Sequence, residues 1–383
     1  MNDVATKIID IYDSENHDAK VTDSSQVPTS YESITPEWLT DVLCKEVDGA
    51  KVVALRLDAP DDGSTNRRRI YVDYNDAGTQ AGLPKSVFCK STAALETRLV
   101  SAMSQAALSE VNFYTKVRPL LKMEAPTPLF SAYDHDNHAS IIMMRDLQGE
   151  VTFCNERTAM DWNKVASQMN TLADLHAPFY ESPLLGTDAI PFQTWADWWR
   201  NMTAICPDFE VYCDKAFADS EALMSPELYR RRGEVWKATV ASAERHRELP
   251  HTIIHCDVHL KNWYCTNAGK MGVSDFQCIT RGHWSRDLIY TLTTALTIED
   301  RRKWEKDLVL YYIERMAERG VPRITADEAW TNMRQQLMTV LAFWTITLRP
   351  APGMPDMQPE ATTTAFLRRI YAAVEDHGSL DSF

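Results

Sequence analysis

The chain has 383 residues, of which 44% are hydrophobic and 25% charged, and its formal net charge is -14. That length exceeds one compact core, so two lobes are expected. An acidic chain is repelled by phosphate backbones and anionic bilayers, which argues against nucleic acid or a membrane surface as partner. The first twenty residues lack the features of a secretion signal, and no apolar run reaches the ~18 residues of a spanning helix. The eight cysteines form no C-x-x-C pair, as expected of reduced thiols in a cytoplasmic protein.

The first part of the chain is rich in strand signals. Residues 1–30 are polar and lack a sustained period, which predicts a frayed segment. Thr35, Pro36 and Glu37 form a helix start, and Gly49 ends that helix. A further helix is predicted over Leu99–Val117. The predicted strands are Lys51–Leu57, Arg69–Tyr74, Ser86–Lys90, Leu129–Tyr133 and Ser140–Met144.

The pattern becomes mostly helical after Leu147. The predicted helices are Ala159–His176, Phe192–Met202, Pro226–Arg247, Arg301–Arg319 and Ala326–Leu348. The predicted strands are Thr252–Ile254, Trp263–Cys265 and Met271–Val273. We therefore expect an α+β protein with a strand-rich lobe over residues 1–147 and a helical lobe over residues 148–383.

One segment concentrates polar side chains suited to phosphoryl transfer. An apolar strand runs into His255 and Asp257, Asn262 follows within a short loop, and Asp275 ends the next short hairpin. Transfer from ATP needs a carboxylate to orient and deprotonate an acceptor hydroxyl, and oxygen ligands to hold Mg²⁺. One or two carboxylates and an amide oxygen suit Mg²⁺, with phosphates and waters completing the octahedron.

The spacing His255-x-Asp257-x-x-x-x-Asn262 resembles the catalytic loop of the aminoglycoside phosphotransferase and choline kinase superfamily. Asp275-Phe-Gln and the later Asp287-Leu-Ile-Tyr are most similar to its ecdysteroid-kinase-like branch (CHK kinase-like). The resemblance implies a protein-kinase-like two-lobed fold, with Asp257 as catalytic base and Asn262 and Asp275 as Mg²⁺ ligands. It also implies a loop-structuring role for His255 and a supporting role beneath the loop for Asp287.

Weaker matches lie upstream in the same order, and the resemblance extends from about residue 51 to 290. Lys90 resembles the lysine that holds the ATP phosphates, and Glu110 the acid that orients it. The run Gly63-Ser64-Thr65-Asn66 resembles a short loop over the nucleotide, which gives Ser64 and Asn66 a nucleotide-binding role. Met144 falls in the strand that resembles the adenine-binding hinge. The implied cofactors are ATP and Mg²⁺.

The sequence also departs from the family pattern. Cys256 stands where many relatives have glycine, and Arg145 where the hinge usually carries an acid. The spacing of His251, His255 and His259 raises a zinc site as an alternative, although the strand pattern before His255 does not align them as a helix would. The eleven tryptophans are expected mainly in the core, and one or two in an acceptor pocket.

These observations predict an ATP- and Mg²⁺-dependent enzyme that phosphorylates a hydroxyl of a small molecule. An aminoglycoside-like sugar, an amino alcohol and a steroid-like alcohol all remain open as acceptors. The alternatives are a non-catalytic nucleotide-binding protein on a kinase scaffold and a protein kinase. The absence of a D-F-G followed by A-P-E counts against the protein kinase. The oligomeric state and the choice between ATP and GTP stay open.

Overall fold

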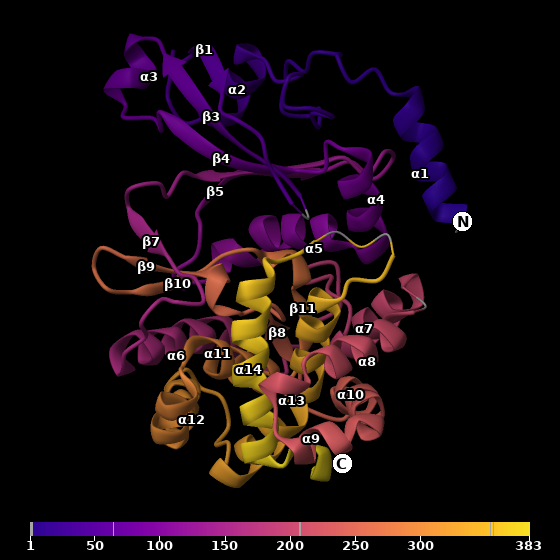
Figure 1. Cartoon of the computed structure of the whole chain (residues 1–383). Helices are drawn as coiled ribbons and strands as arrows, with labels where there is room; N and C mark the ends of the chain where they lie inside the picture. Colours follow the sequence, from indigo (N-terminus) through magenta and orange to yellow (C-terminus); the bar gives the residue numbers. More distant parts are fainter. Residues whose placement is uncertain (1–2, 64, 207, 353, 355) are drawn as a thin grey trace. The chain divides into compact units, whose positions relative to one another are not determined.

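The computed structural model describes residues 3–63, 65–206, 208–352, 354 and 356–383, and the chain divides into two compact units (Figure 1). The first, called the sheet unit below, consists of Met1–Pro119 and Pro126–Gly149. The second, called the helical unit, consists of Leu120–Ala125 and Glu150–Phe383. The predicted α+β class, with a small antiparallel sheet and a larger helical part, is confirmed.

The sheet unit is built around an antiparallel sheet in the order β1-β3-β4-β6-β5, with β2 paired to β3. Its strands are β1 Val52–Leu57, β2 Asp61–Asp62, β3 Asn66–Tyr74, β4 Ser86–Ser91, β5 Pro128–Tyr133 and β6 Ser140–Arg145. Its helices are α1 Asp3–Ser14, α2 Pro36–Leu43, α3 Asp76–Gln80, α4 Leu95–Ser104 and α5 Ala106–Asn112. The predicted capping of α2 is confirmed, because Thr35 Oγ1 accepts the Trp38 N–H at 3.1 Å. Trp38 and Leu39 then bury one face of α2 in the core of this unit.

The single helix predicted over Leu99–Val117 is wrong, because the chain changes direction at Gln105. Gln105 has a left-handed backbone (φ 61°) that ends α4 and starts α5. A π-helical turn over Phe113–Val117 and a 3-10 turn over Arg118–Leu120 complete the segment. No glycine or proline marks the break, so the sequence carried no local signal for it.

The frayed segment predicted for residues 1–30 is also wrong. Helix α1 occupies Asp3–Ser14, and its Ile8 side chain is only 1% exposed. Val21 then forms a parallel bridge with Ile34, so the chain after α1 is tied to the segment before α2. Half of the twelve residues of α1 are apolar, and Val4, Ala5, Ile8, Ile11 and Tyr12 recur at helical spacing, a pattern that predicts a buried helix face.

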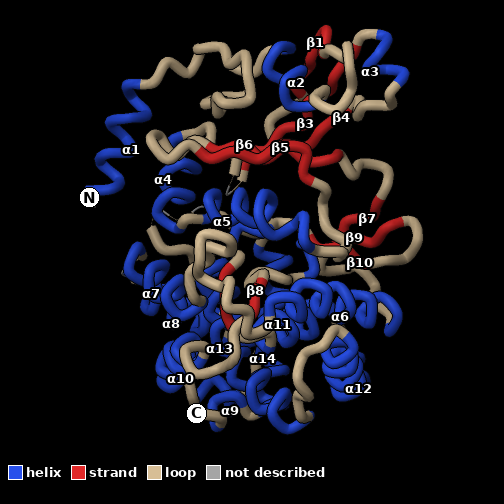
Figure 2. The backbone as a smooth tube through the Cα atoms, turned by 180° about the vertical axis from the view of Figure 1, so that it is seen from behind, coloured by secondary structure: helices blue, strands red, loops and turns tan. Residues whose placement is uncertain are grey.

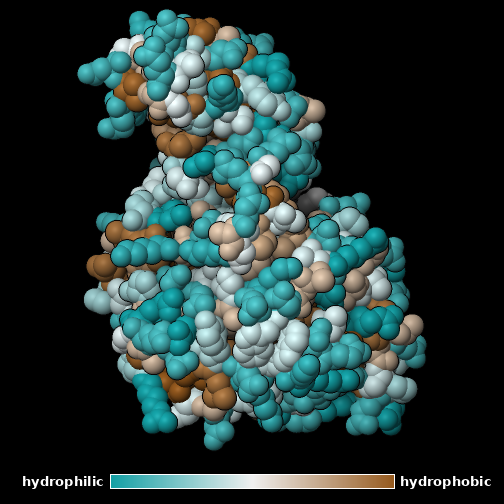
Figure 3. Space-filling model, turned by 90° about the vertical axis from the view of Figure 1, so that its left-hand side faces the viewer, coloured by the Kyte–Doolittle hydropathy of each residue, from teal (hydrophilic) through white to brown (hydrophobic). Residues whose placement is uncertain are grey.

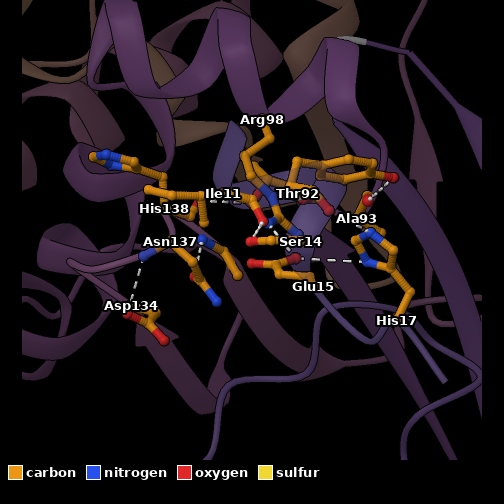
Figure 4. Close-up of polar contacts among 12 residues, drawn as sticks. Ile11, Ser14, Glu15, His17, Thr92, Ala93, Arg98, Asp134, Asn137 and His138 are labelled. Atoms are coloured by element: carbon orange, nitrogen blue, oxygen red, sulfur yellow. Dashed lines mark hydrogen bonds and ion pairs between the residues drawn. The ribbon is translucent and has the colours of Figure 1, made fainter. Parts of the chain in front are cut away.

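Arg98 of α4 contacts residues at and just after the C-terminal end of α1 (Figure 4). Its Nη1 lies 2.7 Å from Glu15 Oε2, and its Nε donates to the Thr92 carbonyl at 3.2 Å. Its guanidinium carbon lies 4.8 Å from the ring centroid of Tyr12, whose hydroxyl donates to Ala93 O at 3.2 Å. The fully buried Arg98 thus contacts Glu15 just after α1, the loop after β4 and an aromatic face, while its Nη2 has no hydrogen-bond partner among the described residues.

The helical unit places short strands among long helices. Its α-helices are α6 Trp162–His176, α7 Trp195–Ile205, α8 Phe209–Asp219, α9 Pro226–Arg230, α10 Arg232–Arg245, α11 Ser285–Ala295, α12 Ile298–Glu318, α13 Ala326–Leu348 and α14 Glu360–His377. Its strands are β7 Val151–Phe153, β8 Thr252–Ile254, β9 Trp263–Thr266, β10 Met271–Val273 and β11 Thr280–Gly282. Single 3-10 turns cover Ala177–Phe179, Glu221–Leu223, Leu260–Asn262, Phe276–Cys278 and Ser379–Asp381.

Two small antiparallel sheets, β10-β9-β7 and β11-β8, result from this arrangement. The prediction of α13 is confirmed to the residue, whereas the single helix predicted over Pro226–Arg247 is divided at Arg231 into α9 and α10. Strands β7 and β11 and helices α8, α11 and α14 were not predicted.

Strand β8 crosses the interior of the helical unit, where Figure 2 shows it among α-helices. Ile254 at its end belongs to one apolar cluster with Cys256 and the α7 tryptophans Trp195, Trp198 and Trp199. These tryptophans are buried, as expected for core residues. Packing in this cluster therefore holds in place the strand that immediately precedes His255 and Asp257.

Figure 3 shows one face, on which hydrophilic side chains predominate and hydrophobic ones form small patches. None of the helices in the part of the chain that the structure describes has the length and apolar character needed to cross a bilayer.

Candidate active site

The loop after β8 makes its turn at Cys256. Strand β8 pairs with β11, where Thr280 lies opposite Ile254, and the chain then adopts a left-handed backbone at Cys256 (φ 68°). A side chain in this region is normally disfavoured by about 1–2 kcal/mol. Glycine would avoid that cost, so neighbouring contacts must hold Cys256 in position.

The first turn of α11 supplies those contacts. Asp287 Oδ2 accepts the His255 N–H at 2.6 Å, and Oδ1 accepts the Cys256 N–H at 2.9 Å. Arg286 Nη2 donates to the Cys256 carbonyl at 3.1 Å. Burial would raise the pKa of Asp287, but the hydrogen bond and charge of His176, together with His255, outweigh it and hold the pKa below its ordinary value. These contacts are those of a residue that supports the loop from beneath.

His255 connects the loop to the segment that carries Asp275. Its Nδ1 accepts the Asp257 N–H at 3.2 Å, so the hydrogen-bond pattern assigns the ring proton to Nε2, which donates to the Ser274 carbonyl at 3.0 Å. The ring also packs 4.7 Å from that of Phe276. Both nitrogens are used within the protein, so this histidine positions its neighbours and is not free to exchange protons with a substrate.

The β9–β10 hairpin brings Asn262 next to the segment that contains Asp275. Val273 lies opposite Trp263, so the residues just outside this pair, Asn262 and Ser274, become neighbours. Ser274 N–H donates to the Asn262 carbonyl at 2.8 Å. Asp275 follows with a left-handed backbone (φ 70°, ψ 67°) that turns the chain at the open end of the hairpin. A thirteen-residue separation in sequence is thereby closed by strand register.

The carboxylate of Asp257 is fixed but remains partly accessible, with its side chain 19% exposed. Oδ1 accepts the Tyr290 hydroxyl at 3.1 Å. Asn262 Nδ2 donates to the Asp257 carbonyl at 2.7 Å and lies 3.4 Å from Oδ2. His259 Nε2 is 3.6 Å from Oδ2, and burial lowers the pKa of this histidine. Oδ1 thus has Tyr290 as its partner, and Oδ2 lies on the side of Asn262 and His259.

The donor set fits a hard divalent cation. The amide nitrogen of Asn262 is committed to Asp257, which leaves its oxygen as the ligand atom, and Asp275 adds a carboxylate from the same end of the hairpin. Within the described ranges, no group of three or more His, Cys, Asp or Glu side chains could hold a metal ion. Mg²⁺ bound by Asn262 and Asp275 would take its remaining ligands from phosphates and water.

Three residues considered for the alternative zinc site, His251, His255 and Cys256, have separate partners. His251 Nε2 is 2.6 Å from the His246 carbonyl, whereas His255 bonds to Ser274. The Cys256 sulfur lies 2.9 Å from Thr280 Oγ1, and burial raises the pKa of its thiol, which disfavours a metal-binding thiolate.

Lys90 and Glu110 meet in the sheet unit, as their predicted pairing requires. Lys90 lies on β4 opposite Ile142 of β6, and its Nζ is 2.8 Å from Glu110 Oε1 and 2.7 Å from Oε2. Glu110 lies on α5, and both side chains are buried. A buried ion pair of this kind holds the ammonium at a defined point.

The other predicted nucleotide contacts are less favoured by the geometry. Ser64 lies outside the described residues. Asn66 uses its whole amide inside the sheet unit: Oδ1 accepts from Ala94 N–H at 2.8 Å and Thr97 Oγ1 at 2.7 Å, and Nδ2 donates to Asp62 at 2.9 Å. These bonds hold Asn66 against the start of α4.

Met144 lies within β6, which has strands on both sides. Its register partners are Phe88 of β4 and Pro128 of β5, so its backbone is part of the sheet. Residues after Arg145 are therefore better placed than Met144 for a hinge. Arg145 occupies the position where the resemblance places an acid, and the next residue in the chain is the acid Asp146. Asp146 Oδ2 accepts from Arg69 Nε at 2.5 Å and from Ser86 Oγ at 2.8 Å.

Sequence reasoning missed two partners of the catalytic loop. Tyr290 reaches Asp257 from α11, and His176 reaches Asp287 Oδ2 at 3.2 Å from the end of α6. Tyr290 stands in the same short run as Asp287, and its three-residue spacing on a helix was the available signal. His176 carried no comparable signal, because its contact depends on how α6 packs against α11.

The family described as the phosphotransferase enzyme family matches residues 101–324, more than half of the chain. The match includes Glu110, Asp257, Asn262 and Asp275, whereas Lys90 lies before it. A comparison with curated proteins finds no match.

Solved structures resemble the chain in fold at low sequence identity. The amicoumacin kinase hAmiN, solved with AMP-PNP, Ca²⁺ and Ami, is 10% identical, with 84% of this chain and 88% of that chain covered and a TM-score of 0.51. Spectinomycin phosphotransferase APH(9)-Ia, solved with ADP and spectinomycin, is 12% identical over 91% and 98%, with a TM-score of 0.47. Plasmodium vivax ethanolamine kinase is 9% identical over 83% and 81%, with a TM-score of 0.45. At these identities the likeness concerns the fold alone.

Proposed function

We propose that this chain, which belongs to the phosphotransferase enzyme family, transfers the γ-phosphoryl group of ATP to a hydroxyl of a small molecule with the aid of Mg²⁺. The observation that carries the proposal is the arrangement of Asp257, Asn262 and the Ser274–Asp275 segment. Oδ2 of the partly exposed Asp257 lies 3.4 Å from the amide nitrogen of Asn262. The main-chain carbonyl of Asn262 accepts a hydrogen bond from Ser274, the residue before Asp275.

Asp257 is the proposed base. The acceptor hydroxyl would lie against Oδ2 and give its proton to this carboxylate as its oxygen bonds to the γ-phosphorus and the bond from that phosphorus to the β-phosphate oxygen breaks. Alignment supplies most of the rate, since the loose transition state leaves little covalent work for the protein. His255, Asp287 and Arg286 serve that alignment by fixing the peptides on both sides of Cys256.

Asn262 and Asp275 are the proposed ligands of Mg²⁺, which would neutralise charge on the phosphates when bound. Lys90, oriented by Glu110, is the proposed partner of the α- and β-phosphates. The acceptor class is still open among aminoglycoside-like sugars, amino alcohols and steroid-like alcohols.

The test is the release of ADP from Mg·ATP by the purified protein with kanamycin, choline, ethanolamine or cholesterol as acceptor. Asp257→Asn keeps the shape of the side chain and removes the base, so turnover should fall by about 10²–10⁴-fold. Asp307→Asn, at an exposed position on α12, is the matched control and should leave turnover unchanged. Lys90→Met should raise the KM for ATP, because the ammonium is lost.

Three other outcomes would contradict the proposal. Full turnover in Asp257→Asn would remove the base assignment. Binding of Mg·ATP without turnover of any acceptor would favour the non-catalytic protein. Phosphorylation of a generic protein substrate, with none of the small alcohols accepted, would favour a protein kinase.

A further inference from the structure

Tyr290 makes a direct hydrogen bond to the proposed base. It lies on α11, three residues after Asp287, and is 1% exposed. Its hydroxyl is 3.1 Å from Asp257 Oδ1. Asp287 and Tyr290 therefore reach the same loop from successive positions on one helix face, the first at its backbone and the second at its carboxylate.

The direction of this hydrogen bond follows from a second partner. Trp344 of α13 places its Nε1 at 2.9 Å from the Tyr290 hydroxyl oxygen. An indole nitrogen can only donate, so the Tyr290 oxygen is the acceptor there and its own proton is available to Asp257. Burial raises the pKa of Tyr290 well above its ordinary value, and the Asp257 carboxylate raises it further, so the phenol keeps that proton.

The two carboxylate oxygens of Asp257 therefore have different surroundings. The terminal torsion of an aspartate is broad and roughly two-fold, so an unconstrained carboxylate would sample many orientations. The phenol occupies Oδ1 and leaves Oδ2 on the side of His259 and Asn262. Trp344 also packs against His259, with ring centroids 5.4 Å apart. The same side chain therefore contacts both Tyr290, the partner of Oδ1, and His259, which lies near Oδ2.

We propose that Tyr290, oriented by Trp344, is a positioning residue that holds Oδ1 of Asp257 so that Oδ2 faces the acceptor hydroxyl. This inference rests on the proposed function. It predicts an effect on kcat, because the alignment of the base matters at the transition state and not for the binding of ATP.

The experiment is a double-mutant cycle of Tyr290→Phe and Trp344→Phe. The rate of ADP formation is measured with the best acceptor among kanamycin, choline, ethanolamine and cholesterol, or with water where none of these is phosphorylated. Tyr290→Phe should lower kcat by about 10–100-fold and leave the KM for ATP within about twofold. Trp344→Phe should lower kcat less. The double variant should equal Tyr290→Phe, because Trp344 acts through the phenol.

The matched control is Tyr371→Phe. Tyr371 of α14 is equally buried, and its hydroxyl lies 2.6 Å from Ser220 Oγ. The control should lose thermal stability but keep the wild-type kcat, which separates a lost buried hydrogen bond from a misplaced base.

The inference is overturned if Tyr290→Phe keeps the wild-type kcat, or if its KM for ATP rises by the same factor as its kcat falls. It is also overturned if the decrease in kcat of the double variant equals the product of the decreases in the two single variants. Should Tyr290→Phe not fold, Trp344→Phe carries the test, and an unchanged kcat overturns it. The two proposals fail differently: turnover that survives Asp257→Asn, or is absent in the wild type, removes the proposed function. A dead Asp257→Asn beside a fully active Tyr290→Phe removes only the positioning role.

Discussion

Ser274 donates two hydrogen bonds to the main-chain carbonyl of Asn262, from its N–H at 2.8 Å and from its Oγ at 3.1 Å. The pair closes the open end of the β9–β10 hairpin. His255 joins the same point by donating to the Ser274 carbonyl. Two short strands and one histidine therefore fix the relative positions of the loop with Asp257 and the segment with Asp275.

Ser274→Ala should weaken this closure without removing it, because the backbone N–H remains. We expect a loss of about 1 kcal/mol in the free energy of unfolding, measured by urea denaturation. The Mg²⁺ concentration for half-maximal turnover should rise, because Asp275 loses an anchor one residue away. Ser379→Ala is the control, since this buried hydroxyl has no hydrogen-bond partner among the described residues. Equal behaviour of the two variants would contradict the role of the Ser274 hydroxyl.

Cys256 provides a second prediction, because its left-handed backbone is unfavourable for any side chain. Cys256→Gly removes about 1–2 kcal/mol of that strain but also loses a buried side chain and adds freedom to the unfolded chain. The net change in unfolding free energy should stay within about 1 kcal/mol, and turnover should be retained. Cys256→Val, which is β-branched, should lose both stability and turnover. Equal stability of the glycine and valine variants would show that the backbone there is not strained.

The fold could be predicted where the signals are local. Helix α13 has a capping Thr325, whose Oγ1 accepts the Glu328 N–H at 3.2 Å, and a continuous apolar face, and its bounds were predicted correctly. The break at Gln105 has no glycine or proline beside it, so tertiary contacts decide it, whereas Gly233 stands two residues after the division at Arg231 and was a local signal for it. Helix α1 was missed although its apolar residues recur at helical spacing, whereas the contact of Glu15 with Arg98, eighty-three residues later, carries no local signal.

In the candidate site, too, local signals predict some residues, whereas others depend on tertiary packing. Asp257, Asn262 and Asp275 stand close together in the chain at a recognisable spacing, and hairpin register alone brings the last two near each other. Trp344 could not be assigned, because it reaches Tyr290 across fifty-four residues through the packing of α11 against α13. The nucleotide-binding role of Asn66 stays a prediction, and the sequence did not reveal that its amide bonds to Ala94 and Thr97 at the start of α4.

Asp287 makes the stability of the helical unit dependent on pH. Its folded-state pKa is held below that of an unfolded aspartate, about 3.9, so the ionised form contributes stability at neutral pH. This contribution should be lost as the pH falls from about 4 through the lower folded-state value. Asp287→Asn should cost about 3 kcal/mol at pH 7, because two backbone N–H groups and His176 lose a buried anionic acceptor.

Urea unfolding of the wild type and Asp287→Asn between pH 3 and 7 checks this dependence. The difference between the two proteins should be largest at pH 7 and shrink toward pH 3. A constant difference across that range would mean that the charge of Asp287 does not contribute.

The contact between Glu15 and Arg98 tests whether the N-terminal helix is part of the folded sheet unit. Glu15→Gln leaves the fully buried Arg98 without the carboxylate that lies 2.7 Å away, and should cost about 3 kcal/mol in urea unfolding. Glu46→Gln, at an exposed position after α2, should change stability by less than about 0.5 kcal/mol. The double variant Glu15→Gln/Arg98→Met should lose less than the sum of the single losses, because no buried charge is left facing a neutral partner. Additive losses, or a Glu15→Gln variant as stable as Glu46→Gln, would instead mean that α1 does not depend on this ion pair and that another contact, such as the burial of Ile8, holds the helix.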